Sequence, residues 1–582
     1  MLRQPNHIFA VALAVLFVLF MSVPGTQSLA QTPPTPPAKP PGDGNDGVAV
    51  TVNNVGSGTP VANGWGNAGE NGGNGVPAGT WTPPFGEMAD DHNNAMPGQP
   101  GYVGGEAGKG GSGGTLTINV GGNADFATAY PTALGTVGGD GGQGGTGGQG
   151  QNGGRGRLSF PGSPSRQSVF NGAVGGLGGS GAAGKDGGSG GALVFNQFAG
   201  EVSFANNIVF GGTGGVGGMG GTGGKGGDGG QGGSTFGSFT DGNGANGANG
   251  GDGGIGGNGG DGGNATFNFS GGTITFSNAT FGGSGGNGGN GGVAGTGGIA
   301  GRAGGQAGVA GTDGNAGFQG NGGNGGVGGS GALIIDGGEV TFQGTTHFGG
   351  LGGLNADGTR AADGNGTLTM NGGILNLDGD MTFRGADSSF MLGRDAMLSS
   401  GGTTNRVQAN SITMNGVVDI ANGRSLELAA ANGVHFNGIL SIGLGTLATP
   451  DLIDDMLLSS FNAFNTPSFD AGLNVFGDLT FGSNATVSLY GGGDDFLASL
   501  YDGWSFGLFS ATGDVNGIDY LLSNWSGFGN NDGFNLAWNA NAGMLMLTYN
   551  EANVPEPATL AIIGLGLAGL GYARRRQMKK AA

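Results

Sequence analysis

The sequence contains no cysteine and few charged side chains, and both shortages restrict what the protein can do. Without cysteine the chain has no disulfides, no thiolate metal ligands and no cysteine nucleophile. Charged residues make up 10% of the chain, with 19 Lys and Arg against 39 Asp and Glu, and the net charge is -20. Such an acidic surface repels nucleic-acid phosphates, so we expect no nucleic-acid partner.

Histidine is also scarce, with 4 residues in the chain, and none has a neighbour at metal-ligand spacing. Gly-x-Ser-x-Gly strings around Ser112, Ser189 and Ser284 lack the strand, elbow and helix of an esterase, and a glycine-rich chain produces them by chance. The sequence therefore predicts no catalytic residue and no enzyme. The alternative is a β-helix enzyme that degrades polysaccharide, which would need charged residues clustered in a cleft.

Glycine supplies 150 of the 582 residues, much of it in Gly-Gly-X tracts. Residues 211–234 are unbroken Gly-Gly-X triplets, and a period of three matches a polyproline-II-like screw. Two outcomes are open. Several tracts pack side by side as a polyglycine-II bundle, or each tract is a flexible loop, because ordering glycine has the largest entropy cost.

Between the glycine tracts the sequence alternates apolar and polar residues with a period of two, which predicts β-strands. Four segments align on a small dyad, each with an apolar pair after it and a phenylalanine five or six residues later. The pairs are Val202/Phe204, Ile274/Phe276, Val340/Phe342 and Leu375/Leu377, and the later residues are Phe210, Phe281, Phe348 and Phe383.

A regular step of 22 residues follows Thr367. One series of apolar pairs is Leu368/Met370, Phe390/Leu392, Ile412/Met414 and Val434/Phe436, and a second is Leu375/Leu377, Ala396/Leu398, Val418/Ile420 and Leu440/Ile442. The last three pairs of the second series keep the 22-residue step, and the first differs by one residue. A fixed period with short strands is typical of a β-solenoid. The predicted fold class is all-β, a parallel β-helix or solenoid with long Gly-Gly-X insertions, plus one C-terminal transmembrane helix. A β-sandwich is the competing all-β fold.

Calcium is the one cofactor that the residues suggest. Around Asp228 and Asp261 the sequence matches the first six positions of the RTX nonapeptide, and Asp252 and Asp261 are nine residues apart. The hydrophobic eighth position is glycine in both copies. We therefore keep two interpretations of Asp228, Asp252 and Asp261, calcium ligands or solvated loop carboxylates, and expect no other cofactor.

The N-terminal residues predict a secretory signal peptide. Arg3 and His7 precede an apolar run, and Ser28-Leu29-Ala30 forms a small-x-small cleavage site. Cleavage between Ala30 and Gln31 would produce the exported chain.

The C-terminal residues predict a short membrane-spanning helix. An uncharged run from Ala558 to Ala573 precedes Arg574, Arg575 and Arg576, a basic flank that stays cytoplasmic. Before the run, Val554, Pro555, Glu556 and Pro557 form an extended and accessible junction.

This tail resembles the PEP-CTERM sorting signal of Gram-negative bacteria. The resemblance covers Val554 to about Lys580 and implies that an exosortase recognises Pro555, Glu556 and Pro557 and cleaves nearby. It further implies an inner-membrane anchor before cleavage, followed by release to the cell surface or exopolysaccharide matrix. It implies nothing about the activity of the exported part.

The predicted organisation follows from these features. It comprises a signal peptide (1–30), a Pro-rich linker (31–47), an irregular Gly/Asn-rich region (48–110), interrupted solenoid turns (111–366), regular turns (367–449), an aromatic-rich β cap (450–550) and the sorting tail (554–582). The predicted function is a non-catalytic structural or adhesive protein of the cell surface or matrix, with exopolysaccharide as a partner. A calcium- or ice-binding adhesin is a further alternative.

Overall fold

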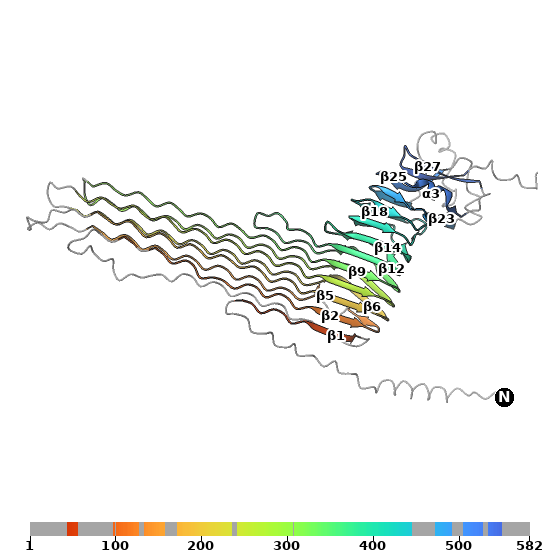
Figure 1. Cartoon of the computed structure of the whole chain (residues 1–582), viewed down its shortest axis with the longest axis horizontal. Helices are drawn as coiled ribbons and strands as arrows, with labels where there is room; N and C mark the ends of the chain where they lie inside the picture. The colour runs from red at the N-terminus through yellow and green to blue at the C-terminus, as the bar shows by residue number, and fades with distance from the viewer. Residues whose placement is uncertain are drawn as a thin grey trace, which may run out of the picture. The chain divides into compact units, whose positions relative to one another are not determined.

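The structure is a computed structural model that describes residues 43–55, 97–98, 100–126, 133–156, 171–234, 241–306, 308–444, 472–491, 505–527 and 533–549. Within these ranges the chain is nearly all β, in a large and mostly parallel sheet (Figure 1). The one helix there is α3 (Ile518–Ser523). The all-β part of the predicted fold class is therefore confirmed.

The strands fall into three consecutive groups along the chain. The first group alternates with glycine tracts and contains β1 (Val50–Val55), β2 (Leu116–Val120), β3 (Ala124–Asp125), β4 (Ala133–Leu134), β5 (Leu193–Gln197), β6 (Glu201–Phe210), β7 (Ala265–Phe269), β8 (Thr273–Phe281), β9 (Gly331–Ile335), β10 (Glu339–Phe342) and β11 (Thr346–Phe348). The second follows closely spaced turns and contains β12 (Gly366–Leu377), β13 (Met381–Phe383), β14 (Ser389–Ser400), β15 (Thr404–Ala409), β16 (Ser411–Met414), β17 (Val417–Ile420), β18 (Ser425–Ala430), β19 (Val434–Phe436) and β20 (Ile439–Leu444). The third contains β21 (Gly472–Phe476), β22 (Leu479–Phe481), β23 (Thr486–Gly491), β24 (Ser505–Ala511), β25 (Val515–Asn516), β26 (Trp525–Ser526), β27 (Phe534–Asn539) and β28 (Met544–Tyr549).

Most strands pair in parallel with a strand that comes much later in the chain. Leu116 of β2 pairs with Leu193 of β5, which pairs with Ala265 of β7. The sequence distance between neighbouring rungs is 66 to 77 residues in the early turns, falls to 35 and then 22 residues, and is 47 and 36 residues between the later strands. The distance falls because the glycine tracts lie only in the early turns of the chain.

The alignments predicted from apolar pairs are confirmed except in one place. The register joins Val202, Ile274, Val340 and Leu375, and it joins Leu368, Phe390, Ile412 and Val434. The predicted alignment of Ala396/Leu398 with Leu375/Leu377 and with Val418/Ile420 is wrong, because Leu398 and Ser400 take that place on both sides.

This two-residue slip places Ser400 in the core, where it is 1% exposed. Its hydroxyl lies 2.8 Å from the side-chain oxygen of Asn405, which is itself fully buried. Asn405 donates in turn to the carbonyl of Gly379. Because these polar groups satisfy each other inside the core, an apolar pattern cannot reveal the register here.

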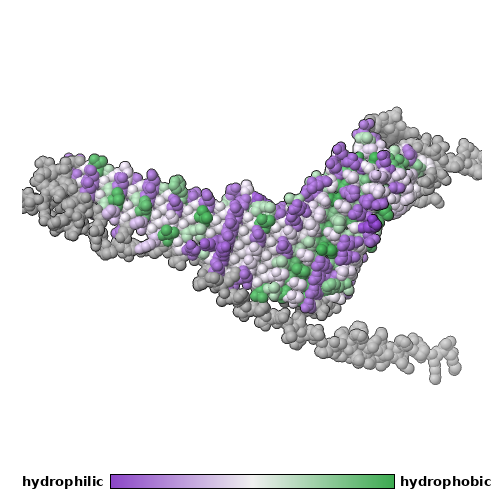
Figure 2. Space-filling view, in the orientation of Figure 1, coloured by the Kyte–Doolittle hydropathy of each residue, from purple (hydrophilic) through white to green (hydrophobic). Residues whose placement is uncertain are grey.

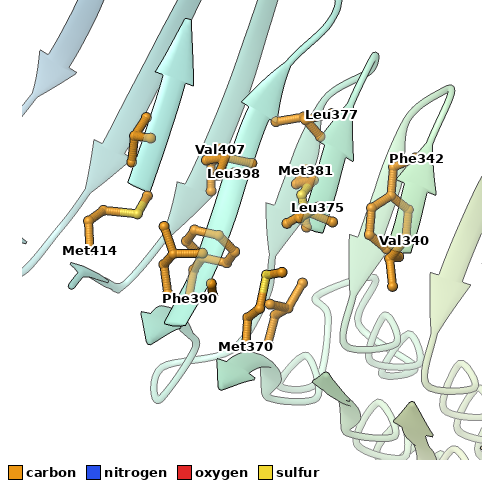
Figure 3. Close-up of a cluster of buried hydrophobic side chains, with 14 of the residues drawn as sticks. Val340, Phe342, Met370, Leu375, Leu377, Met381, Phe390, Leu398, Val407 and Met414 are labelled. Atoms are coloured by element: carbon orange, nitrogen blue, oxygen red, sulfur yellow. The ribbon is translucent and has the colours of Figure 1, made fainter. Parts of the chain in front are cut away.

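The core is built from side chains that stack on their equivalents in neighbouring turns. The rings of Phe204, Phe276 and Phe342 stack with centroids 5.2 and 5.1 Å apart. In later turns most core residues are Leu, Met, Val and Ile, which point into the same interior together with Phe390 (Figure 3). Burying these rows on one side of each strand produces the alternating pattern seen in the sequence.

The glycine tracts run out from the strands and back, side by side (Figure 1). We call residues 136–156, 211–234 and 282–306 the outgoing tracts. We call residues 100–114, 171–191, 241–264 and 308–330 the returning tracts. Two hydrogen-bonded layers result, with the third residue of each triplet on the outside, where hydrophilic and hydrophobic side chains alternate (Figure 2).

Each Gly-Gly-X triplet can use its three backbone N–H groups in three ways. The first glycine donates within its own layer, as Gly214 does to the carbonyl of Ser284 at 2.9 Å. The second donates to the other layer, as Gly215 does to Gly188 at 2.8 Å. The third N–H donates to an Asn or Asp side chain, as Val216 does to Asp140 at 2.8 Å. These bonds favour the bundle over the flexible loop.

The far end of the strand stack changes from parallel to antiparallel pairing. β24 pairs in parallel with β21 and antiparallel with β28, and β27 pairs antiparallel with β28. The parallel stack therefore continues through β26, beyond the predicted start of the cap at residue 450. In the region 48–110, for which the sequence predicts no regular structure, the structure places β1 and part of a returning tract.

In the part of the chain that the structure describes, no helix is both long and apolar enough to cross a membrane. The predicted transmembrane helix at 558–573 lies outside the described residues, as does the signal peptide.

Candidate functional site

The residues predicted for sorting and export all lie outside the described residues. They are Ala30, Gln31, Val554, Pro555, Glu556, Pro557, Arg574, Arg575 and Arg576. Their predicted roles therefore rest on the sequence. Within the described residues, the candidate site lies on the strands.

One sheet face presents a continuous row of small polar side chains, which we call the polar ladder. Parallel pairing places one member from each turn directly beside the next, and all eight are half-buried. The members are Ser203, Thr275, Thr341, Asn376, Ser399, Asp419, Ser441 and Ser488. Neighbouring strands lie about 4.8 Å apart, so the ladder offers a hydrogen-bonding group at nearly every such step.

A second row on the same face is apolar in its central part, and we call it the apolar column. It comprises Ile374, Met397, Val417 and Ile439, each two residues before a member of the polar ladder. Ile374 and Ile439 are each 41% exposed. The face therefore offers an apolar strip and a hydrogen-bonding strip side by side, both running along the stack.

Asp419 is the one carboxylate in the polar ladder, and it is held by Tyr490 of β23, which is two strands farther along the stack. Burial, followed by the hydrogen bond to Asp419 and its negative charge, raises the pKa of Tyr490 to about 12. The phenol therefore stays protonated and donates to the carboxylate at every physiological pH.

A different ladder, made of asparagine side chains on β1, β2, β5 and β7, has a structural role. Asn119 donates to Asn53 at 2.6 Å, Asn196 to Asn119 at 2.7 Å, and Asn268 to Asn196 at 2.8 Å. Because each amide is bonded to the next, these side chains stabilise the parallel register.

A cavity of about 410 Å³ opens over β6, β8 and β11, lined in part by Asn207, Asn278 and His347. The Nδ1 atom of His347 is buried and has no hydrogen-bond partner in the structure. Burial and the positive charge of Arg384 lower the pKa of His347, so the ring is neutral at pH 7. A single neutral histidine among amides offers polar contacts to a ligand, without a carboxylate partner in that lining.

The three aspartates predicted as possible calcium ligands accept hydrogen bonds from backbone N–H groups of neighbouring tracts. Asp252 accepts the N–H of Phe318 at 2.8 Å, and Asp261 accepts that of Val327 at 2.8 Å. Burial opposes ionisation of Asp228, but bonds from the Ile299 N–H and Lys225 hold its pKa below the usual value.

These carboxylates do not form one chelating site. Asp252 and Asp261 are separated by nine residues of extended tract, roughly 28 Å at 3.1 Å per residue. Across the described ranges, no group of three or more His, Asp or Glu residues could hold a metal ion. Calcium binding by Asp228, Asp252 or Asp261 remains a prediction.

Sequence reasoning identified the strands that carry the polar ladder but not the ladder itself. Its outward residues are the polar half of the period-two pattern, so their spacing was visible. Their alignment into a single row depends on a register between residues that are up to 72 positions apart in the sequence, as Ser203 and Thr275 are.

One family description matches the chain, the PEP-CTERM protein-sorting motif, over residues 553–577. No curated protein and no solved structure matches the chain. The match supports the predicted exosortase-sorted, exported protein with an envelope or surface location, and it covers only the tail.

Proposed function

We propose that this chain is a non-catalytic structural and adhesive protein of the cell surface or exopolysaccharide matrix, released from its membrane anchor by an exosortase. The observation that carries the proposal is the PEP-CTERM motif at residues 553–577. In this account Pro555, Glu556 and Pro557 are recognised, and Arg574, Arg575 and Arg576 stay on the cytoplasmic side until cleavage.

The exported part is a β-solenoid with a polyglycine-II-like bundle inserted in its early turns. Parallel pairing of successive turns, with a step of 22 residues in the most regular part, supports the solenoid. Hydrogen bonds between tracts in two directions support the bundle. Both parts depend on repetition, which suits an extended scaffold that spaces and holds other molecules.

The adhesive surface is the polar ladder together with the apolar column. An extended polysaccharide repeats its sugar rings at nearly the strand spacing, so successive rings meet equivalent side chains. The C–H faces of the rings would pack on Met397 and Val417, while hydroxyls bond to Asn376, Ser399 and Ser441. Each contact is weak, but many along one chain add up to useful affinity.

The charges of this face favour an uncharged glycan. The register positions of the two rows include the carboxylates Glu201, Glu339 and Asp419 and no Lys or Arg. An anionic polysaccharide would therefore meet like charge, which costs binding free energy.

The test compares two triple variants of the exported protein. N376A/S399A/S441A removes three ladder groups, each worth about 0.5–1.5 kcal/mol, so we expect binding to neutral matrix polysaccharide to weaken at least about tenfold. T367A/S389A/S411A removes three outward hydroxyls from another face, on the turns that carry Asn376 and Ser399 and on the turn that follows them, and should leave binding unchanged. Equal binding by wild type and the ladder variant would refute the adhesive role of this face.

A further inference from the structure

Residues 349–356 form a short glycine tract at the edge of the bundle. This tract extends along only part of the length of its neighbours. It lies in a slot between the outgoing tract 282–306 and the returning tract 308–330. Its Leu351 carbonyl accepts from the N–H of Gly285 at 2.9 Å, and the Gly353 N–H donates to Gly326 at 2.7 Å. The short tract therefore uses the same two kinds of bond as every longer tract.

After Ala356 the chain turns back, and the Asn355 N–H bonds to Thr359 at 2.8 Å. The slot continues beside residues 309–321. Among the residues that the structure describes, no tract fills this part, and the side chains bordering it are exposed. The open part of the slot is an edge of the kind that invites another chain to pair.

The residues along the slot change where the short tract stops. Beneath the tract, every third residue is glycine: Gly328, Gly325 and Gly322. A Cβ at Gly328 would lie 2.0 Å from the Gly350 carbonyl oxygen, and one at Gly325 2.4 Å from Gly353. A side chain at these positions therefore excludes a tract from the slot.

In the open part of the slot, the same every-third positions carry side chains. They are Gln319, Ala316, Asp313 and Ala310, all exposed. The boundary between glycine and larger residues thus coincides with the end of the short tract.

Asp313 also occupies a hydrogen bond that a further tract would need. Under the short tract, the Gly285 and Gly288 N–H groups donate to carbonyls of that tract. At the equivalent place farther along, the Ala300 N–H donates to the Asp313 carboxylate at 2.7 Å. The Asp313 side chain therefore occupies the slot and also accepts the hydrogen bond of the Ala300 N–H, which a further tract would otherwise accept.

A methyl group at the first place of a triplet is enough to interrupt the bonding between tracts. Ala107 lies at this place, as Ala310 and Ala316 do. The described bonds between tracts 100–114 and 171–191 pass from Gly104 to Gly110 and omit Ala107.

We infer that Ala310, Asp313, Ala316 and Gln319 form a stop that keeps a Gly-Gly-X tract of a second copy of this chain out of the slot. A second copy is the occupant to exclude, because its tracts repeat the pattern that the short tract uses to fill the same slot. Without these four side chains, we expect a tract of one copy to pair in the slot of another copy at high protein concentration. This inference is independent of the proposed function.

The test uses sedimentation velocity of the full exported protein over a concentration series. The variant A310G/D313G/A316G/Q319G opens the slot and should self-associate at concentrations at least about tenfold below those needed by wild type, equivalent to about 1.4 kcal/mol. If the fourfold variant does not fold, D313G/Q319G removes the two long side chains and should show the same direction of change.

A matched control adds the same number of glycines on the outside of the same tract. T312G/N315G/N321G/N324G changes exposed third positions and should sediment like wild type. Wild-type behaviour of the slot variants would overturn the inference. Equal association by the slot variant and the control would overturn it as well, because the effect would then come from glycine content.

Discussion

At the scale of single residues, the stacked phenylalanines contribute the largest buried surfaces in the early turns. Phe276 is fully buried and lies between the rings of Phe204 and Phe342. Phe276→Ala should lower the free energy of unfolding by about 3–5 kcal/mol, because it removes a ring and leaves a cavity between two turns. Chemical denaturation measures this, and Thr275→Ala on the outward side of the same strand is the control. Equal losses for the two variants would contradict the ladder core.

His347 gives the protein a measurable dependence on pH. Burial and Arg384 lower its pKa in the native state, whereas the unfolded chain regains the ordinary value of 6.5. The unfolded state then binds the proton first, so this stabilisation is complete above pH 6.5 and is lost as the pH falls toward the native pKa.

The measurement is the melting temperature of wild type and His347→Gln at pH 7.5 and pH 5.5. Wild type should lose more on acidification than the variant, since the variant lacks the group that titrates. Parallel losses would show that His347 has the same pKa in both states.

At the scale of single elements, the glycine tracts depend on side chains that cap backbone N–H groups of their neighbours. Asp252 and Asp261 cap Phe318 and Val327. An amide oxygen accepts the same bond, so D252N/D261N should keep the melting temperature of wild type, while D252A/D261A should lower the free energy of unfolding by about 1–3 kcal/mol.

The same pair of variants distinguishes capping from calcium binding. Capping alone predicts no change in melting temperature between calcium and chelator. A rise with calcium that D252N/D261N abolishes would show that these carboxylates bind the ion, because the amide removes the charge that calcium requires.

The sequence predicts the strands well because burial alternates along them. The dyad of Val340 and Phe342 aligns with its neighbours as expected, although 66 residues separate it from the preceding copy. The prediction fails at Ser400, since a polar residue enters the core once Asn405 bonds to it. Periodicity reports which residues face inward but cannot anticipate a buried polar pair.

Neither the ordered packing of the glycine tracts nor the alignment of the polar ladder could be predicted from the sequence. An isolated tract has no internal hydrogen bonds, so its order depends on neighbours supplied by other turns. The Gly215 N–H, for example, finds its acceptor on Gly188, in another tract. Such dependence is non-local, and a single stretch of sequence carries no sign of it.

At the scale of the whole molecule, two features support one account. The tail carries a sorting motif, and the described residues form a long array of repeated parallel strands and tracts. A secreted chain without disulfides needs another source of stability, and here backbone bonds and stacked side chains between turns provide it. The central claim is that the tail is removed when the protein reaches the surface.

Mass spectrometry of the protein recovered from the matrix, from hosts with and without the exosortase, tests this claim most directly. The account predicts a C-terminus close to Pro555–Pro557 in the presence of the exosortase and retention of the tail in its absence. A chain that ends at Ala582 in both hosts would contradict it, and the protein would then stay attached through its tail.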